Sequence, residues 1–399
     1  MSFFETVEAL PEDPIFSLPK LFKEDAHPLK VNLGIGAYQD SEGLPFVLTT
    51  VRDVELQLIQ KEKTMEYLPI LGDPAYIHES LKLIFGDNHP YLQEKKIIGA
   101  QTVGGTNALW IGAAFLADHG FKIVYLSDPT WPNHHMIFRR AGLAIKTYPH
   151  YDNAHHCIPF EDLCSCIKTM PPSSIILLQS CCHNPTGMDF SFSQWQEISH
   201  LIKQQKVFPF FDLSYQGFGK GIDEDAKPIR YFIEQGHELM VANSFSKNFG
   251  MYGERAGLLA LATNQPEISL RAESHIKQII RATYSNPPRL AAKIVATILN
   301  SADLTKAWKH ELQAMRGRIS AMREALSFGL QSKSSHLDFS FLNSQTGIFS
   351  FIGLSPTQVQ RLRTEKGVFI LENSRLNIAG INPHNLDYVI DSILHVVKK

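Results

Sequence analysis

A lysine beside hydroxyl groups and an arginine is the feature of this sequence best suited to covalent chemistry. Lys247 follows the apolar run 239–242, which predicts a buried strand. An amine at such a position loses hydration, and desolvation beside another cation lowers its pKa and makes it a nucleophile. Ser244, Ser246 and Arg255 are suited to binding a phosphate group next to it. The pattern indicates a lysine that forms a Schiff base with pyridoxal phosphate, and the alternative is an ordinary solvated lysine in a loop.

Several other polar groups occupy comparable positions along the chain. Asp212, Asn184 and Trp131 each follow a segment that predicts a strand. Gly105 and Thr106 stand at the expected start of a helix, where free backbone N–H groups bind anions. In open parallel sheets, ligands bind beyond the carboxyl ends of the strands. We therefore expect these groups to meet the lysine in one site.

The chemistry of these residue types matches what a pyridinium cofactor requires. Asp212 could pair with the ring nitrogen, because a buried carboxylate needs a cationic partner, and His134 could hold that carboxylate from behind. Trp131 could stack on the ring, while Asn184 and Tyr215 could donate hydrogen bonds to its phenolic oxygen. Each residue also has an ordinary structural alternative, such as a turn or cap for Asp212 and core packing for Trp131.

The elements that must position these groups form an α/β pattern. From residue 97 to residue 262, segments that predict strands alternate with segments that predict helices. The strands are almost uniformly apolar, so we expect a largely parallel sheet with helices on both faces. Beyond residue 264, long helical segments and short strand candidates predict an α+β second domain. These strand candidates are residues 339–342, 347–351, 368–371 and 375–377.

The composition is that of a globular protein whose partners are small molecules or other protein chains. The chain has 399 residues, of which 44% are hydrophobic and 20% charged, which excludes a disordered chain and favours two or three domains. Its formal net charge of -2 provides no basic field for nucleic acid. The sequence contains no apolar run near the roughly 18 residues of a membrane span and no secretory signal. The odd count of 5 cysteines argues against a disulfide framework, so we expect the protein in the cytoplasm.

No metal site is expected from the histidines and cysteines. The adjacent histidines at 134–135 and 155–156 do not face one site easily. The cysteines at positions 164 and 166 have no second pair at zinc-binding spacing. The neighbouring Cys181 and Cys182 are expected to pack as small apolar residues rather than to form a strained disulfide.

Considered together, these motifs resemble those of the aspartate/aromatic aminotransferases, which are class I aminotransferases and pyridoxal-phosphate enzymes of fold type I. The resemblance extends from about residue 13 to the last predicted helix, residues 386–397. Each motif is weak alone, and their combination in one order is specific. The stretches that carry it are residues 31–36, 131–134, 182–187, 215–218, 246–250 and 284–288.

The resemblance implies a particular domain organisation. A large domain, residues 45–313, would hold the cofactor on a mostly parallel seven-stranded sheet covered by helices. A smaller α+β domain would comprise residues 14–44 and 314–399. Residues 1–13 carry several large apolar side chains. They would form an N-terminal arm that packs on a neighbouring subunit, and the alternative is a frayed tail.

The resemblance also implies a role for each candidate residue. Lys247, Asp212 and Tyr215 would be the catalytic residues. Lys247 would hold the cofactor and move a proton between the substrate Cα and the cofactor C4′. Asp212 would pair with the pyridinium nitrogen, and Tyr215 would contact the phenolic oxygen together with Asn184. The implied cofactor-binding residues are Gly105, Thr106, Trp131, Asn184, Asp212, Tyr215, Ser244, Ser246, Lys247 and Arg255, joined by Tyr67 from the other subunit.

The implied reaction is transfer of the amino group of aspartate to 2-oxoglutarate in two half-reactions, a ping-pong mechanism. Arg375 would bind the substrate α-carboxylate through its planar fork, with Gly36, Trp131 and Asn184 nearby. Arg281, contributed by the other subunit, would meet the distal carboxylate. The enzyme would therefore be a homodimer with shared active sites.

Departures from the family pattern leave the substrate open. Thr283 stands where the aspartate enzymes usually carry asparagine, and the entrance loop 37–46 differs at its rim, so tyrosine or phenylalanine is an alternative amino donor. A lyase or β-decarboxylase on the same fold would share every cofactor residue. A pyridoxal-binding regulator would need a fused DNA-binding domain, for which residues 1–13 leave no room. A dehydrogenase would need a glycine fingerprint that Gly34 and Gly36 do not complete.

Overall fold

The central sheet contains seven strands among the residues that the structure describes, which are residues 2–10, 12, 14–334 and 337–397 of this computed structural model. The strand order is β2-β8-β7-β6-β5-β3-β4. All neighbouring strands are parallel except β8, which is antiparallel to both β2 and β7. The strands are β2 (Ile97–Val103), β3 (Ile123–Asp128), β4 (Ala144–Pro149), β5 (Ile175–Gln179), β6 (Phe208–Leu213), β7 (Leu239–Ser244) and β8 (Ala256–Ala262).

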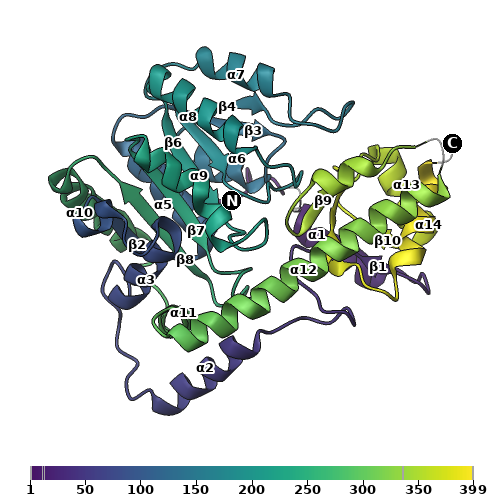
Figure 1. Cartoon of the computed structure of the whole chain (residues 1–399), viewed down its shortest axis with the longest axis horizontal. Coiled ribbons are helices and arrows are strands. Elements are labelled where there is room, and N and C mark those ends of the chain that lie inside the picture. Colours follow the sequence, from purple (N-terminus) through teal and green to yellow (C-terminus); the bar gives the residue numbers. More distant parts are fainter. Residues whose placement is uncertain (1, 11, 13, 335–336, 398–399) are drawn as a thin grey trace.

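Helices cover both faces of this sheet (Figure 1). Successive side chains of a strand point to opposite faces, and in β5 Ile175 and Leu177 belong to one hydrophobic cluster, whereas Ile176 and Leu178 belong to the other. The sheet is therefore buried on both sides, which explains its nearly uniform apolar strands. The first cluster includes side chains of α5 (Gly104–Asp118), α6 (Asn133–Arg140) and α10 (Pro266–Thr283), and the second includes those of α3 (Pro74–Phe85), α7 (Phe160–Lys168), α8 (Phe192–Gln205) and α9 (Ile222–Glu234).

The carboxyl ends of the parallel strands meet at one edge of the sheet. Asp212 near the end of β6 lies opposite Gln179, the last residue of β5. Because β8 runs the other way, it begins at this edge, and its first residues pair with the end of β7. Arg255, which immediately precedes β8, therefore lies beside Ser244, which ends β7. The expected convergence of polar groups at one edge is confirmed.

A second lobe packs beside this edge (Figure 1). It contains two small sheets, a parallel pair formed by β1 and β10 and an antiparallel pair formed by β9 and β11. The long helix α12 (Ala302–Lys333) runs along both lobes. The other elements of the lobe are α1 (Pro14–Glu24), β1 (Val31–Asn32), the 3-10 helix η1 (Ser340–Ser344), β9 (Phe349–Phe351), α13 (Pro356–Lys366), β10 (Val368–Phe369), β11 (Arg375–Asn377), η2 (Ile378–Gly380) and α14 (Leu386–Val397).

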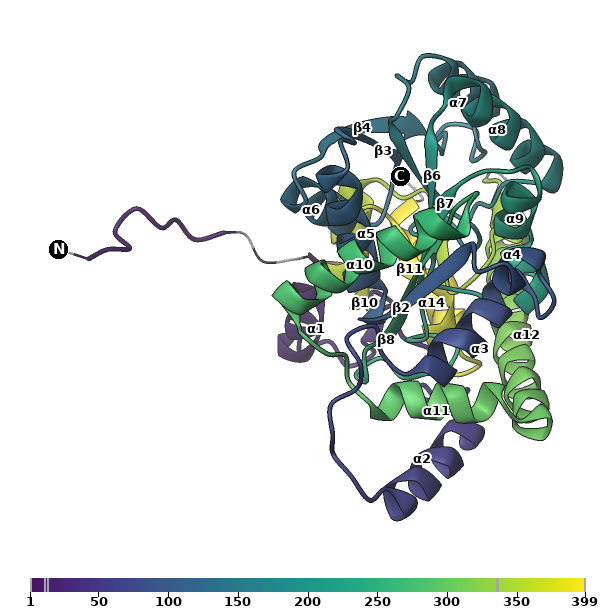
Figure 2. The same ribbon diagram turned by 90° about the vertical axis from the view of Figure 1, so that its left-hand side faces the viewer.

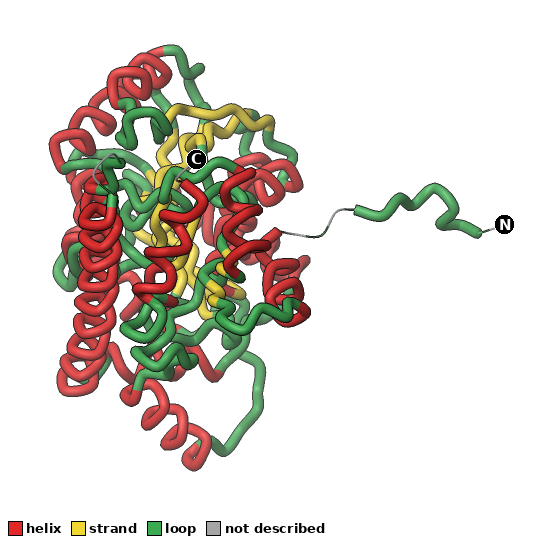
Figure 3. Tube along the Cα trace, turned by 90° about the vertical axis from the view of Figure 1, so that its right-hand side faces the viewer, coloured by secondary structure: helices red, strands yellow, loops and turns green. Residues whose placement is uncertain are grey.

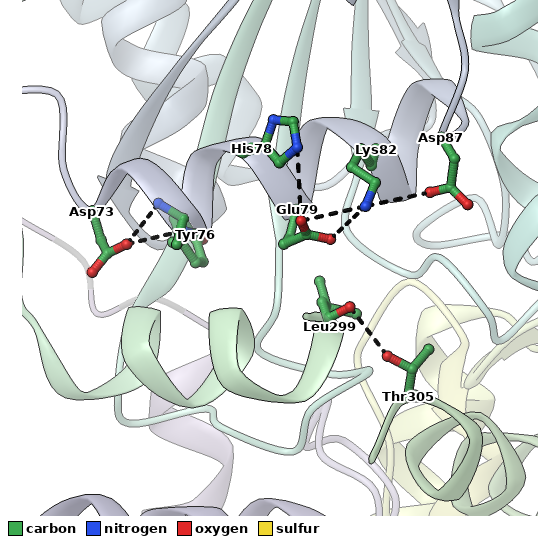
Figure 4. Close-up of polar contacts among 9 residues, drawn as sticks. Asp73, Tyr76, His78, Glu79, Lys82, Asp87, Leu299 and Thr305 are labelled. Atoms are coloured by element: carbon green, nitrogen blue, oxygen red, sulfur yellow. Dashed lines mark hydrogen bonds and ion pairs between the residues drawn. The ribbon is translucent and has the colours of Figure 1, made fainter. Parts of the chain in front are cut away.

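Side chains fix the ends of the helices below the sheet. Asp73 accepts hydrogen bonds from the backbone N–H groups of Ala75 and Tyr76 and so caps α3 (Figure 4). Thr305 in α12 donates to the carbonyl oxygen of Leu299, the last residue of α11. These bonds tie the helical layer together. The remaining helices are α2 (Thr49–Lys61), α4 (Pro90–Gln93) and α11 (Leu290–Leu299).

The N-terminal residues 2–10 project away from the rest of the chain (Figures 2 and 3). Phe3 is 99% exposed and Leu10 is 82% exposed, and Phe4 and Val7 are exposed as well. The described part of this chain leaves these large apolar side chains uncovered, and exposed apolar side chains of this kind are typical of interaction surfaces. Residues 1, 11 and 13 of the predicted arm lie outside the described part of the chain.

One predicted strand is wrong, because residues 339–342 lead into the 3-10 helix η1. Asp338 accepts the N–H of Ser340, and the N–H of Leu342 donates to the carbonyl of Phe339, so local turn bonds replace a strand ladder. The other predicted strands are present, most of them with shifted ends and residues 256–262 and 375–377 with the predicted ones. No helix of the described residues is both long enough and apolar enough to span a membrane.

Candidate active site

A cavity of about 570 Å³ opens at the sheet edge where the two lobes meet. Its walls include almost all of the predicted site residues. A cavity of about 680 Å³ near α3 and β2 is largely apolar and contains none of them. The first cavity is lined by Ile35, Gly36, Ala37, Gly105, Thr106, Leu109, Trp131, Asn184, Asp212, Ser214, Tyr215, Ser244, Ser246, Lys247, Tyr252, Arg255, Phe349 and Arg375.

Lys247 is half-buried, because its side chain borders the cavity while protein surrounds its stem. Desolvation lowers the pKa of its amine from 10.5 to about 8. The carboxylate of Asp212 opposes this shift, and the positive charges of Arg255 and Arg375 reinforce it. The Nζ atom lies 4.8 Å from the centre of the Tyr215 ring. A sizeable fraction of the amine is therefore unprotonated near neutral pH, as a nucleophile or a base requires.

Asp212 is buried and held by two neighbours. Its Oδ2 lies 3.1 Å from Nε2 of His134, and the Nδ1 of that histidine lies 2.8 Å from the hydroxyl of Thr130. With the Thr130 hydroxyl donating to Nδ1, the tautomer that places the proton on Nε2 donates to the carboxylate. Ser214 donates to Oδ1 at 2.6 Å. Each carboxylate oxygen keeps a free lone pair, so Asp212 can still receive a cationic N–H from the cavity.

The phosphate-binding residues gather at the N-terminus of α5. Gly104 has φ +74, and a Cβ atom there would lie 2.4 Å from Nη2 of Arg255. Arg255 donates from Nη1 to the hydroxyl of Ser246 at 3.2 Å, and the Ser246 N–H donates to the hydroxyl of Ser244 at 3.2 Å. Gly105 and Thr106, in the first turn of the helix, border the same space. Free helix N–H groups, hydroxyls and a guanidinium together form a binding site for a phosphate dianion.

Arg375 lies at the other end of the cavity and is buried. It donates to Oδ1 of Asn184 at 3.0 Å and to the carbonyl of Gly34 at 3.1 Å, and its guanidinium lies 3.9 Å from the centre of the Phe349 ring. Burial lowers its pKa to about 10. Its Nε has no hydrogen-bond partner in the described part of the chain. A carboxylate from a ligand would satisfy this donor and compensate the charge.

Tyr215 borders the cavity between these groups. Burial raises the pKa of its phenol well above the usual value, with the positive charge of Arg375 opposing the shift. The phenol therefore stays protonated and acts as a hydrogen-bond donor. Trp131 packs edge to face against His134, with ring centroids 5.2 Å apart, so one side of its indole ring remains available to the cavity.

The donor set fits pyridoxal phosphate. Asp212 offers an anion to a ring nitrogen, Trp131 a flat face, Tyr215 and Asn184 donors, and Lys247 an amine of lowered pKa. The α5 terminus provides the anion site. The Nε of Arg375, which has no hydrogen-bond partner among the described residues, is suited to a substrate carboxylate rather than to the cofactor.

Two predicted site residues lie outside this cavity. Tyr67 is 87% exposed, and it borders a separate cavity of about 870 Å³ that also reaches Arg255. Arg281 is exposed at the end of α10 and donates to the hydroxyl of Ser285. Both were expected to act in the site of another subunit, so their placement in a single chain leaves that prediction untested.

The sequence did not reveal every residue of the site. Ser214 follows Asp212 by two positions, a spacing that could have identified it as a partner of the carboxylate. Tyr252 and Leu109 lie in no motif. Tyr252 accepts the N–H of Tyr38 at 2.9 Å and so fixes the entrance segment from across the cavity.

Among the described residues, one group of cysteine and acidic side chains is close enough to suggest a metal. Cys181, Cys182 and Asp225 are buried with their ligand atoms within 4.8 Å of one another. The Asp225 carboxylate already accepts four backbone N–H groups, from residues 217, 219, 220 and 221. The pKa of each thiol is raised, by the bond to its neighbour and burial for Cys181 and by burial for Cys182, so both stay protonated. This group is a structural cluster, and the absence of a metal remains a prediction.

Comparison with known proteins agrees with this geometry. Residues 28–393 match the family described as aminotransferase class I and II. The chain is 43% identical over 395 residues to an aspartate aminotransferase of Salmonella typhi, covering 99% of this chain and 100% of that protein. It is 42% identical over 395 residues to the aspartate aminotransferase of Escherichia coli, with the same coverage.

Solved structures give the same result. An aromatic-amino-acid aminotransferase from Burkholderia pseudomallei, covalently bound to pyridoxal phosphate, has a TM-score of 0.97 at 40% identity and covers 99% of this chain and 100% of its own. An aromatic amino acids aminotransferase from Psychrobacter sp. B6, cocrystallised with aspartic acid, has a TM-score of 0.98 at 38% identity over 100% of both chains. The chain described here is therefore a member of the aminotransferase class I and II family, a fold type I enzyme that uses pyridoxal phosphate.

Proposed function

We propose that this enzyme transfers the amino group of aspartate to 2-oxoglutarate by a ping-pong mechanism, giving oxaloacetate and glutamate. The observation that carries the proposal is one cavity that contains Lys247, with its pKa lowered to about 8, the carboxylate of Asp212 and the guanidinium of Arg375, whose Nε has no hydrogen-bond partner among the described residues. The relatives named aspartate aminotransferase over nearly their full length support the choice of substrate.

The cofactor, when bound, supplies an electron sink that acidifies the substrate Cα–H bond. The protein supplies a base at the correct place. We propose that Nζ of Lys247 takes the proton from the substrate Cα and returns it to C4′ of the cofactor. An amine with a pKa of about 8 can both accept and donate a proton near neutral pH.

The other cavity residues are proposed to hold the cofactor in place. Asp212, supported by His134 and Ser214, keeps a negative charge beside the ring nitrogen. Tyr215 and Asn184 donate to the phenolic oxygen, and Trp131 stacks on the ring. The proposed phosphate ligands are Gly105, Thr106, Ser244, Ser246 and Arg255, with Tyr67 contributed by the other subunit.

Arg375 is proposed to bind the substrate α-carboxylate, and Arg281 from the other subunit to bind the distal one. The apolar part of the cavity wall favours a second candidate function. Ile35, Leu109 and Phe349 border the same cavity as Arg375 and offer apolar surface to an aromatic ring. Tyrosine and phenylalanine are therefore proposed as further amino donors, and an aromatic main activity is the alternative.

The proposed assembly is a homodimer. The exposed positions of Tyr67 and Arg281 support it, because neither reaches the cavity of its own chain. The apolar N-terminal arm, residues 1–13, is proposed to pack on the partner. The proposed domain division is 14–44 with 314–399 for the small domain and 45–313 for the large one, which places a boundary inside α12. Five free cysteines support a cytoplasmic location.

The decisive experiment is a kcat/KM panel of aspartate, tyrosine and phenylalanine with 2-oxoglutarate as acceptor, and of glutamate with oxaloacetate as acceptor. We expect aspartate to be a good donor, with oxaloacetate formed in equal amount to glutamate. A preference for tyrosine over aspartate would move the assignment to an aromatic aminotransferase. Consumption of aspartate without formation of glutamate would indicate a lyase or decarboxylase.

A further inference from the structure

Gln179, the last residue of β5, brackets the backbone of Asn184. Its side-chain amide accepts the Asn184 N–H at 2.8 Å and donates to the Asn184 carbonyl at 3.1 Å. Both bonds are buried, and Gln179 is only 7% exposed. One neutral side chain thus satisfies both backbone groups of a single loop residue. No motif drew attention to this glutamine, and it does not border the cavity.

Asn184, whose backbone Gln179 holds, connects the cofactor end of the site with the Arg375 end. Oδ1 of Asn184 accepts a hydrogen bond from Arg375 at 3.0 Å, which leaves the Nδ2 donor of the same amide for another acceptor. The sheet register places Gln179 opposite Asp212 on the adjacent strand. The position of the Asn184 amide relative to the Asp212 carboxylate is therefore set through Gln179.

We propose that Gln179 is a positioning residue that holds the Asn184 amide against the phenolic oxygen of bound pyridoxal phosphate and, through Asn184, aligns Arg375. This inference rests on the proposed function. A displaced amide donates a weaker hydrogen bond. A hydrogen-bond donor stabilises the negative charge on this phenolic oxygen. The stabilisation is strongest when the nitrogen that links the cofactor to Lys247 carries no proton. Weakening the donor therefore raises the pKa of that linkage.

The chain contains a matched control in Gln345. Its amide accepts the N–H of Phe351 at 3.1 Å and donates to the carbonyl of Phe351 at 2.9 Å, the same bracket with similar geometry. Gln345 is also buried, at 3% exposure. Neither Gln345 nor Phe351 borders the cavity. Phe351 is the strand partner of Arg375, so loss of this bracket removes the same pair of hydrogen bonds next to Arg375 and leaves the Asn184 backbone untouched.

The experiment compares the Gln179→Met and Gln345→Met holoenzymes with the wild type. Methionine keeps the length of the side chain and removes both polar atoms. The visible absorbance band is titrated with pH, and kcat and KM are measured for aspartate. In Gln179→Met we expect the band pKa to rise by about half a unit to one unit, the equivalent of one ordinary hydrogen bond, together with a several-fold rise in KM. In Gln345→Met we expect a lower thermal midpoint and an unchanged band pKa.

A double variant shows whether the effect acts through Asn184. With Asn184→Ala in the background, Gln179→Met should no longer shift the band, because the group it positions is gone. Where Gln179→Met does not load the cofactor, Gln179→Glu is tested in the same two backgrounds, since it retains the acceptor for the Asn184 N–H.

Three results would overturn the inference: an unshifted band in the Gln179 variants, an equal shift in Gln345→Met, or a shift that persists without the Asn184 side chain. A wild-type protein that shows no visible band or no amino transfer would count against the proposed function instead. The two failures are therefore distinguishable.

Discussion

At the scale of single residues, the site depends on how protein charges set the protonation of one amine. Lys247 has neighbours of both signs, and desolvation is the largest of the influences on its pKa. The residue types and their positions after predicted strands were sufficient to predict this lysine and the carboxylate of Asp212, whereas Arg375 was predicted only from the resemblance to the aminotransferases. The bracket by Gln179 was not predictable, because a glutamine that satisfies a backbone residue has no sequence signature.

Replacement of Lys247 tests the covalent assignment. We expect Lys247→Ala to lose the visible band of the linked cofactor and to lower kcat by several orders of magnitude, because it removes both the attachment point and the proton carrier. Absorbance spectra of the purified variant with added pyridoxal phosphate provide the measurement. Lys168→Ala, at an exposed lysine on α7, is the control and should keep the wild-type spectrum. A normal band in Lys247→Ala would refute the assignment.

Replacement of Arg281 tests how the distal carboxylate is read. We expect Arg281→Ala to lower kcat/KM for aspartate by about 100-fold or more, since an unpaired buried carboxylate costs several kcal/mol. The value for phenylalanine should change less than tenfold, because that substrate has no distal charge. Equal losses for the two substrates would show that Arg281 does not contact the distal carboxylate.

At the scale of elements, the site is built by strand direction. Four parallel strands deliver polar groups to one edge, and their apolar sequences made this predictable. Arg255 reaches the same edge only because β8 is antiparallel to β7. The direction of a strand depends on the tertiary fold rather than on local sequence. The residues of the phosphate site could therefore be predicted from their types, whereas the strand topology that brings them together could not. The short segment 339–342 was mistaken for a strand for a different reason: local turn bonds, such as that from the N–H of Ser340 to Asp338, override its apolar pattern.

The first turn of α5 gives a prediction at this scale. We expect Gly104→Ala to weaken cofactor binding, because a Cβ at this residue would displace Arg255, whose Nη2 is 2.4 Å away, and because φ +74 disfavours any side chain. The measurement is the dissociation constant of pyridoxal phosphate by spectrophotometric titration, with an expected increase of at least about tenfold.

Gly120→Ala is the matched control for this variant. Gly120 also has a positive φ, +94, but nothing lies within 4 Å of a Cβ placed there. It should lose about 1 kcal/mol of unfolding free energy and keep wild-type cofactor affinity. Equal effects of the two variants on affinity would show that Arg255 is not involved.

At the scale of the whole molecule, subunits are proposed to share their sites. Mixing Lys247→Ala and Arg281→Ala chains tests this directly. In a mixed dimer, one site would carry both substitutions and the other would carry none. Random reassociation of equal amounts should therefore restore about one quarter of the wild-type aspartate activity, since half of the dimers are mixed and half of their sites are intact. Activity that stays at the average of the two parents would contradict the shared site, as would a single-chain mass of 44.9 kDa by light scattering of active enzyme.

Acid stability is a second whole-molecule property that the structure determines. His150 is buried, and its ring stacks on His183 with centroids 3.6 Å apart. Desolvation lowers the pKa of His150 from 6.5 to about 4. Between these pH values the unfolded chain binds the extra proton, so stability falls as the pH falls through this window, by up to roughly 3 kcal/mol for this one group. We expect His150→Gln to flatten the loss between pH 6.5 and 4 in urea unfolding, whereas His200→Gln, at an exposed site, should leave the slope unchanged.

The lowered pKa of Lys247 has a consequence for chemical labelling. Relative to a lysine at the ordinary value of 10.5, a pKa of about 8 leaves roughly 300 times more free amine at neutral pH, because each pKa unit is a factor of ten. Before the cofactor is loaded, an aldehyde added in limiting amount would react at this position in preference to the surface lysines. Lys247 therefore competes with the surface lysines for the limiting aldehyde and reacts faster. Aldehyde-tethered probes should label one lysine per chain.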